Sequence, residues 1–329
     1  ESLVAVDIND GELLWHFQMV HHGVWDYDLP AAPTLIDINV DGRSIKAVAQ
    51  ISKQGFTYVF DRVSGEPVWP IEERAVPQSA VPGEKLSATQ PFPSRPAAFE
   101  PQGISDETLI DFTPELREEA LRNIEPFDYG PLFTPPSLRG AIQFPGWGGG
   151  GEWHGAAFDP ETSLFYVPSA SGPIVVQLTE ADASESNLRY RRGGARSVDG
   201  PQGLPLTKPP YGRITAINMN TGEHEWVVPH GEGIRQEIID KGILDPGPVG
   251  STHRVGPLLT QTLLLFAQID GERNLLRAFD KMTGSVIHEH ELPLGPQGTP
   301  MTYMVDGKQY ITIAVGGRID ARLVTLSLP

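Results

Sequence analysis

A repeated strand–turn–strand pattern constrains the fold of this chain more than any other feature. In each intact copy an apolar, strand-like run ends on Asp or Asn, and a glycine follows four residues later. The intact copies are centred on Asp7, Asp61, Asn218 and Asp280, and a degraded copy lies at Asp159. An Asp or Asn that caps a turn, followed by a Gly at positive φ, is typical of a β-hairpin. The repeats therefore predict an all-β protein.

The spacing of the copies indicates the architecture. Successive capping residues lie 54, 98, 59 and 62 residues apart. Units of this length can each hold about four short strands, which is the make-up of a β-propeller blade. We therefore expect an all-β chain built of propeller blades. We interpret the tryptophans that follow most of the repeat glycines as packing residues rather than ligand platforms.

The 98-residue step predicts an insertion between blades. We place it in the Pro-rich residues 70–145, and we expect a second loop excursion over residues 185–212. The insertion contains one predicted helix, Pro114–Ile124. Thr113 is its expected N-cap, and Pro114 suits the first helical position because it has no N–H to leave unpaired.

Composition excludes several classes of function. The chain carries a net charge of −17, with its acidic residues dispersed, so we expect no nucleic-acid partner. It contains no cysteine, which excludes disulfides, thiolate nucleophiles and zinc–thiolate sites. The sequence does not begin with Met and starts inside a strand pattern, so we expect a mature product or a fragment of something longer.

The densest group of polar and aromatic side chains lies between His21 and Pro30, and Lys53 follows 27 residues after Asp26. A carboxylate can accept a proton or bind a hard cation, and a lysine can stabilise a developing oxyanion. These are the working groups of a redox site. The alternatives are that Asp26 caps a strand end and that Lys53 is a surface lysine.

Further motifs occur in a fixed order along the chain. They are Gln90–Pro93, Leu132–Ser137, Phe144–Gly146, Trp153 and Thr299–Tyr303. Together with the repeats, the His21–Pro30 segment and Lys53, this series resembles the C-terminal half of the dehydrogenases that depend on pyrroloquinoline quinone (PQQ). It is most similar to the membrane glucose dehydrogenase branch, which includes quinate-type enzymes.

The resemblance implies an eight-bladed propeller with PQQ in its central channel. It implies that residues 1–329 are a partial β-propeller domain, which supplies about four to five of these blades. It implies oxidation of a sugar, polyol or other alcohol by hydride transfer to PQQ, with electrons passing to a quinone or cytochrome. Asp26 matches the catalytic carboxylate and a ligand of the metal, which the resemblance implies is Ca²⁺ rather than a lanthanide. Lys53 matches the residue that hydrogen-bonds the quinone oxygens. Trp153 and Glu152 match a segment beside the cofactor.

Three neighbours of Asp26 have less defined roles. His21 and His22 could line the substrate pocket or could hydrogen-bond within a blade. Asp28 lies on the same face as Asp26 if the segment is extended. In lanthanide-dependent methanol dehydrogenases an Asp at this place adds a metal ligand, but the sugar-oxidising branch also carries it. We therefore do not expect Asp28 to bind the metal directly.

Two positions depart from the family pattern. Gly23 stands where the family usually has Asp, and Pro168 stands where relatives place an Asn near PQQ, so that side-chain contact should be lost. Ca²⁺ takes about six to eight oxygens, and one matched carboxylate is too few. We therefore expect that the missing N-terminal propeller half, or a partner chain, completes the site and that the isolated chain is not a competent holoenzyme.

The resemblance also implies a periplasmic protein, tethered to the membrane through an N-terminal region. A different class of function is a non-catalytic propeller scaffold of the outer-membrane assembly type, which shares the repeat frame. A third is a degenerate half-propeller that binds a glycan. The pairing of the His21–Pro30 segment with Lys53 favours the enzyme, because a scaffold has no reason to keep these residues together.

Overall fold

The computed structural model describes residues 1–327, which form several antiparallel sheets with few helices. The predominantly β structure expected from the sequence is confirmed. The number of propeller blades stays a prediction. Contacts divide the chain into two compact units that interleave in sequence. The first unit comprises Glu1–Pro30, Ser52–Gly150 and Ser171–Pro209, and the second comprises Ala31–Ile51, Gly151–Ala170 and the described chain from Pro210 onward.

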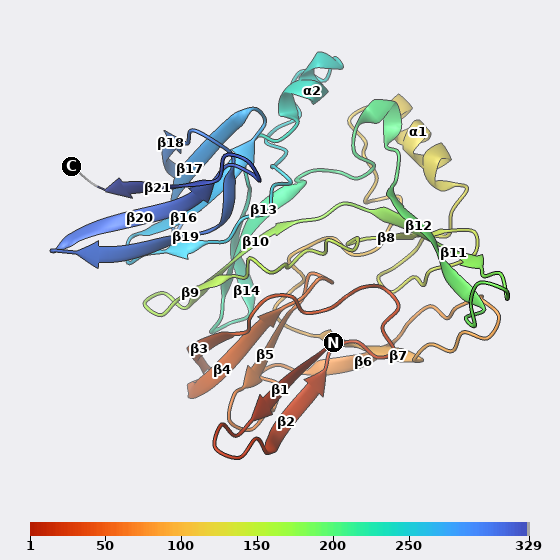
Figure 1. The fold of residues 1–329 in the computed structure, drawn as a ribbon, viewed down its shortest axis with the longest axis horizontal. Helices are drawn as coiled ribbons and strands as arrows, with labels where there is room; N and C mark the ends of the chain where they lie inside the picture. The colour runs from red at the N-terminus through yellow and green to blue at the C-terminus, as the bar shows by residue number, and fades with distance from the viewer. Residues whose placement is uncertain (328–329) are drawn as a thin grey trace. The chain divides into compact units, whose positions relative to one another are not determined.

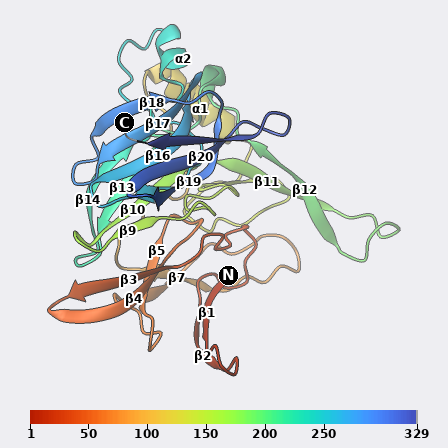
Figure 2. The ribbon, with the colours of Figure 1, turned by 60° about the vertical axis from the view of Figure 1, so that its left-hand side comes forward.

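The first unit contains two hairpins, β1–β2 and β6–β7, and a sheet of order β12-β11-β8. The long β11–β12 hairpin is plain in Figure 2. The elements of this unit are β1 (Ser2–Val6), β2 (Leu13–Gln18), β5 (Thr57–Asp61), β6 (Ile71–Ala75), β7 (Thr89–Pro93), α1 (Pro114–Ile124), β8 (Ala141–Gln143), β11 (Ile174–Glu180), β12 (Tyr190–Ser197) and the 3₁₀ turn η1 (Pro201–Gly203).

The second unit contains two four-stranded sheets, of order β14-β13-β10-β9 and β15-β16-β17-β18, a three-stranded sheet β19-β20-β21, and the paired strands β3 and β4 (Figure 1). Its elements are β3 (Thr34–Val40), β4 (Arg43–Ile51), β9 (Ala157–Asp159), β10 (Leu164–Ala170), β13 (Gly212–Asn218), β14 (Glu223–Pro229), α2 (Arg235–Asp240), β15 (Leu258–Leu259), β16 (Leu263–Asp270), β17 (Arg273–Asp280), β18 (Val286–Glu291), β19 (Pro296–Val305), β20 (Lys308–Val315) and β21 (Arg322–Ser327).

The repeat turns have the predicted geometry. In each intact copy the side-chain oxygen of the capping Asp or Asn accepts the backbone N–H two residues later, at 2.8–3.0 Å. The glycine N–H donates to the carbonyl of the same capping residue. These glycines have φ between 71° and 78°: Gly11, Gly65, Gly222 and Gly284. In the degraded copy Ser163 occupies the glycine position with a φ of 60°, which is a strained conformation for a residue with a Cβ atom.

The repeat glycines also provide a packing surface for tryptophan. A Cβ atom added at Gly65 would lie 2.6 Å from Cγ of Trp15, and one added at Gly284 would lie 2.8 Å from Cε3 of Trp226. In both cases the tryptophan belongs to the repeat that precedes the glycine. Gly65 and Gly284 therefore each form a turn and also leave room for a tryptophan ring. The two tryptophans, Trp15 and Trp226, are packing residues.

Helix α1 has the predicted bounds. The Oγ1 atom of Thr113 accepts a hydrogen bond from Leu116 N at 3.3 Å, which is the expected N-cap interaction. Leu116, Ala120 and Ile124 form its buried face. The division of the chain into blades with insertions at 70–145 and 185–212 stays a prediction.

A buried histidine lies in the core of the second unit. His230 is 2% exposed, and its ring lies 5.0 Å from the ring of Phe266 in an edge-on arrangement. Burial, and then the positive charge of Arg277, lower the pKa of His230 to about 3. Arg277 itself is buried, and it donates to a carboxylate oxygen of Asp270 at 2.7 Å. His230 is therefore neutral at physiological pH, and it can become charged in the folded chain only in acid.

Candidate active site

The segment that carries Asp26 is anchored by its aromatic residues. Trp25 and Tyr27 are 0% and 1% exposed, whereas the side chains of Asp26 and Asp28 are about half-exposed. Asp26 has a φ of 60°, a left-handed conformation that Asp tolerates better than most residues. The two rings are buried and both carboxylates reach Lys53, although Asp26 is not in the extended conformation that was assumed from the sequence.

Two of the sequence motifs hold this segment in place. The indole Nε1 of Trp25 donates to the carbonyl of Thr134 at 3.0 Å, and the Tyr27 hydroxyl donates to the carbonyl of Pro145 at 2.7 Å. The ring of Phe133 meets both aromatic rings edge-on, at 5.1 and 5.9 Å. Buried aromatic residues whose polar atoms are also hydrogen-bonded fix a chain segment strongly. The Leu132–Ser137 and Phe144–Gly146 motifs thus support the acidic segment.

Lys53 lies under the two carboxylates. It occupies the turn between β4 and β5, and its side chain is 9% exposed, so it is not a surface lysine. Its ammonium Nζ donates to Asp28 Oδ1 at 2.5 Å and to Asp26 Oδ2 at 3.1 Å. Burial alone would lower the pKa of Lys53, but the hydrogen bonds to Asp28 and Asp26 and their negative charges together raise it. Lys53 is therefore a charged, buried ammonium.

The ammonium of Lys53 can donate one further hydrogen bond. A lysine ammonium carries three N–H groups, and within residues 1–327 two carboxylates accept from Nζ of Lys53. The third N–H can donate to a further acceptor such as a carbonyl oxygen of a ligand. Asp26, with a half-exposed carboxylate beside this donor, can accept a proton from a hydroxyl group.

Two glycines that were not singled out in the sequence contact Lys53, Gly150 at its backbone carbonyl and Gly149 at its side chain. Gly150 N donates to the carbonyl of Lys53 at 2.9 Å. Gly149 has a φ of 63°, and a Cβ atom added to it would lie 2.3 Å from Cγ of Lys53. The run of four glycines at 148–151 is the sequence feature that could have indicated this contact, because glycines let the backbone approach another residue closely. Only glycine at position 149 lets the backbone lie so close to the lysine.

Both histidines of the segment bind glutamates. Nε2 of His21 lies 2.9 Å from Glu73 Oε1, and Nε2 of His22 lies 3.0 Å from Glu84 Oε1. The backbone of His21 is also held at both its N–H and its carbonyl by the side chain of Gln90, at 2.8 and 2.6 Å. The histidines thus make the local hydrogen bonds that were one of their two expected roles, and a pocket role stays a prediction.

Glu152 and Trp153 belong to the second unit. The ring of Trp153 is exposed and Glu152 is buried, with its Oε2 accepting the backbone N–H of Trp153 at 3.2 Å. In the same unit, the carbonyl of Pro168 is 3.2 Å from Nε2 of the buried His154. The contact of Glu152 and Trp153 with a cofactor stays a prediction.

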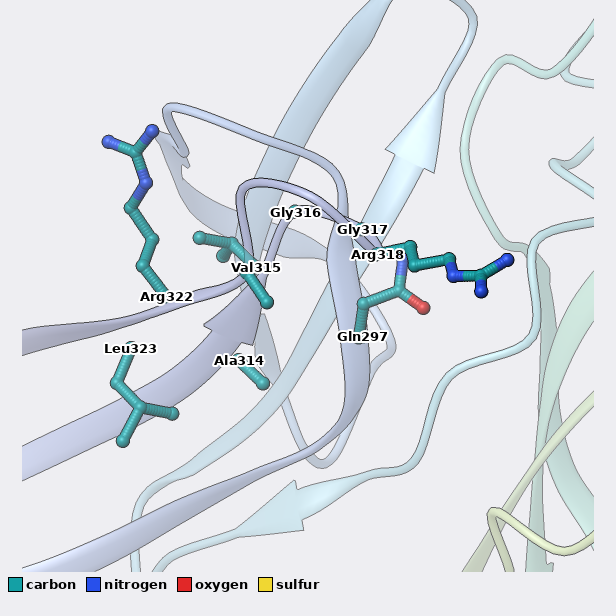
Figure 3. Close-up of a pocket in the computed structure, with 9 residues that line it drawn as sticks. Gln297, Ala314, Val315, Gly316, Gly317, Arg318, Arg322 and Leu323 are labelled. Carbon is teal, nitrogen blue, oxygen red and sulfur yellow. The ribbon is translucent and has the colours of Figure 1, made fainter.

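A separate open pocket lies in the second unit, at the ends of β20 and β21 (Figure 3). Its floor includes Ala314, Val315 and Leu323, and Arg318 and Arg322 extend from its rim in different directions. None of the residues predicted from the sequence lines this pocket. We therefore do not assign it to the candidate site.

The described residues do not form a complete metal site. Among residues 1–327 no group of three or more His, Asp or Glu side chains is arranged to hold a metal ion. Asp26 and Asp28 together offer two carboxylates, and a lysine ammonium already lies between them. The carboxylate of Asp26 could serve as one ligand of a calcium ion, but the described residues do not supply the six or so oxygens that calcium needs. In the same part of the chain no helix has the length and apolarity to cross a membrane.

Comparison with known proteins identifies relatives over the whole chain. Residues 1–311 match the family described as "PQQ: Glucose/ethanol/alcohol dehydrogenase, beta-propeller domain". The chain is 32% identical to the quinoprotein glucose dehydrogenase of Escherichia coli K12, over 96% of this chain and 42% of that protein. It is also 32% identical to the quinate/shikimate dehydrogenase (quinone) of Acinetobacter baylyi, again over 96% and 42%. The chain therefore spans less than half the length of these relatives.

A solved structure shows the same fold. The quinohemoprotein alcohol dehydrogenase of Comamonas testosteroni superimposes with a TM-score of 0.58 and 23% sequence identity. The match covers 96% of this chain and 38% of that one. The antiparallel sheets described above thus correspond to part of that larger β fold.

Proposed function

Because the chain belongs to the PQQ family of glucose, ethanol and alcohol dehydrogenase β-propeller domains, we propose that it carries the Asp26 and Lys53 part of an alcohol-oxidising active site. The resemblance inferred from the sequence motifs is confirmed by this membership. The observation that supports the proposal is the buried ammonium of Lys53, held by two half-exposed carboxylates and backed by a glycine loop. Burial of a charged lysine costs free energy, and a scaffold protein has no function that requires this cost.

The proposed chemistry divides between two residues. PQQ, when bound, supplies a quinone that accepts hydride from the carbinol carbon of the substrate. Asp26 is the general base that takes the hydroxyl proton onto a carboxylate oxygen. Lys53 would hold a quinone oxygen through its remaining N–H and would stabilise negative charge at that oxygen, as a donor in an oxyanion hole does. Glu152 and Trp153 are proposed to lie against the cofactor.

We propose that the metal of this site is Ca²⁺, with Asp26 as one ligand. The remaining oxygens would come from a part of the protein outside this chain or from a partner chain, since the described residues offer too few. A lanthanide fits less well with the sugar-oxidising relatives. His21 and His22 are proposed to lie near the substrate.

The substrate class follows from the relatives, whose names specify glucose and quinate or shikimate. We propose a sugar, polyol or other alcohol as the substrate and a quinone or cytochrome as the electron acceptor. We further propose a periplasmic protein that contains a propeller larger than the four to five blades predicted for this chain. The isolated chain would then need the rest of that propeller for activity.

Reconstitution of the full-length protein tests the proposal. The protein is loaded with PQQ and Ca²⁺, and the reduction of a dye acceptor is measured with a panel of aldoses, polyols and simple alcohols. Asp26→Asn should lower kcat about 10²–10⁴-fold, the range for loss of a general base. Asp41→Asn is the matched control, because Asp41 is an exposed Asp at a similar φ of 51° in a hairpin turn. Absence of dye reduction with every substrate, or equal activity of the two variants, would contradict the proposal.

A further inference from the structure

We propose that Asp28 is the positioning residue for Lys53, which leaves Asp26 free to act on the substrate. The catalytic purpose given to Asp28 rests on the proposed function. The contact between Asp28 and Lys53 is observed independently of that function. Asp28 is neither the general base nor a metal ligand in this account. Its carboxylate fixes where the buried ammonium points, and so where the third N–H of that ammonium can meet a ligand.

The two contacts of Lys53 are unequal. Nζ lies 2.5 Å from Asp28 Oδ1 and 3.1 Å from Asp26 Oδ2. Charge-assisted hydrogen bonds strengthen as they shorten, so Asp28 makes the stronger contact.

The burial of Lys53 explains why it needs a second partner. Its side chain is 9% exposed, and a buried charge that loses its partner is strongly destabilising. If Asp26 were the sole partner, a carboxylate that turns toward a substrate hydroxyl would leave the ammonium of Lys53 unpaired. Asp28 supplies a second carboxylate, so the ammonium keeps a partner.

The chain around Asp28 holds its carboxylate in position. On one side, Tyr27 is buried and its hydroxyl is bonded to the carbonyl of Pro145 at 2.7 Å. On the other side, Pro30 restricts Leu29 to an extended conformation. Asp28 is therefore fixed from both directions, and Asp26 is likewise flanked by the buried Trp25 and Tyr27. The fixed backbone at Asp28 suits a positioning role.

Two other roles for Asp28 make different predictions. If it were a metal ligand, its loss would weaken the binding of Ca²⁺ and leave the contribution of Lys53 unchanged. If it were merely part of the fold, its loss would lower stability by an amount independent of Lys53. Positioning instead requires that the effects of Asp28 and Lys53 be coupled.

A pair of double-mutant cycles measures that coupling without any cofactor. The single and double variants of Asp28→Asn with Lys53→Met are compared in urea unfolding, and the same is done for Asp26→Asn with Lys53→Met. We expect the shift in the unfolding midpoint to be non-additive in both cycles and larger for Asp28. Additive shifts for Asp28, or a larger coupling for Asp26, overturn the inference.

A second experiment measures the affinity for PQQ. Binding is followed by the quenching of tryptophan fluorescence in the full-length protein at saturating Ca²⁺. Asp28→Asn should weaken PQQ binding about tenfold, as expected for loss of one charge-assisted contact. Asp28→Glu should restore most of it, and Asp28→Asn should have no effect in the Lys53→Met background. A change in Ca²⁺ affinity with PQQ affinity unaltered overturns the positioning role. If the unmutated protein binds no PQQ, the proposed function fails, and the unfolding cycles alone decide the pairing.

Discussion

Replacement of Gly149 by Ala probes how closely the glycine loop holds Lys53. The added Cβ would lie 2.3 Å from Cγ, 2.6 Å from Cβ and 2.8 Å from Cα of Lys53. The lysine cannot move aside easily, because its carbonyl is bonded to Gly150 N and its ammonium is bonded to two carboxylates. The loop itself must shift, and the shift disturbs the position of the ammonium.

The expected cost has two parts. An L residue in the left-handed region, where Gly149 has a φ of 63°, costs about 1–2 kcal/mol. Overpacking against a side chain that cannot yield costs about 1–3 kcal/mol. Gly149→Ala should therefore lower the free energy of unfolding by about 2–5 kcal/mol. Gly11→Ala should cost only the backbone term of about 1–2 kcal/mol, because Gly11 has a φ of 76° and no atom lies within 4 Å of an added Cβ.

Urea unfolding followed by far-ultraviolet circular dichroism compares the two variants, provided that they share one m-value. PQQ binding measured on the same variants should be weakened by Gly149→Ala and unaffected by Gly11→Ala. Destabilisation by Gly149→Ala that lies within about 0.5 kcal/mol of that by Gly11→Ala would refute the tight packing of the loop on Lys53.

Two further predictions concern the second unit. Ser163→Gly should raise the free energy of unfolding by about 0.5–1 kcal/mol, measured in urea, because Ser163 holds a φ of 60° in a turn where the intact repeats have glycine. No gain would show that Ser163 is not strained. The pKa of His230 is lowered from 6.5 to about 3 by burial, so its contribution to stability is complete above pH 6.5 and is lost as the pH falls towards 3. His230→Phe should flatten the loss of stability between pH 6.5 and 4, and an unchanged pH profile would contradict this assignment.

The local structure was predictable from the sequence to a large extent. The repeat turns, with Asp or Asn as the cap and Gly at positive φ, follow from short-range backbone chemistry, and so does the helix Pro114–Ile124 with its Thr113 cap. The shared placement of Asp26 and Asp28 does not follow from simple alternation in an extended segment, because Asp26 has a φ of 60°.

The contacts that complete the site were not predictable in the same way. The packing of Gly149 on Lys53 joins residues that are 96 positions apart, and no local pattern specifies it. The sequence also did not show that Asp28 makes the shorter contact with Lys53, because that depends on how the buried Trp25 and Tyr27 rings set the segment. Side-chain distances of this kind arise from the packed core.

The structure of the full-length protein bound to PQQ and Ca²⁺ would test the central claim most directly. The account predicts that Nζ of Lys53 lies about 2.7–3.2 Å from a quinone oxygen while it keeps its contact with Asp28. It also predicts that a carboxylate oxygen of Asp26 faces the substrate side of the cofactor. PQQ bound away from Lys53, or a Lys53 that leaves Asp28 and makes no contact with PQQ, would contradict the account.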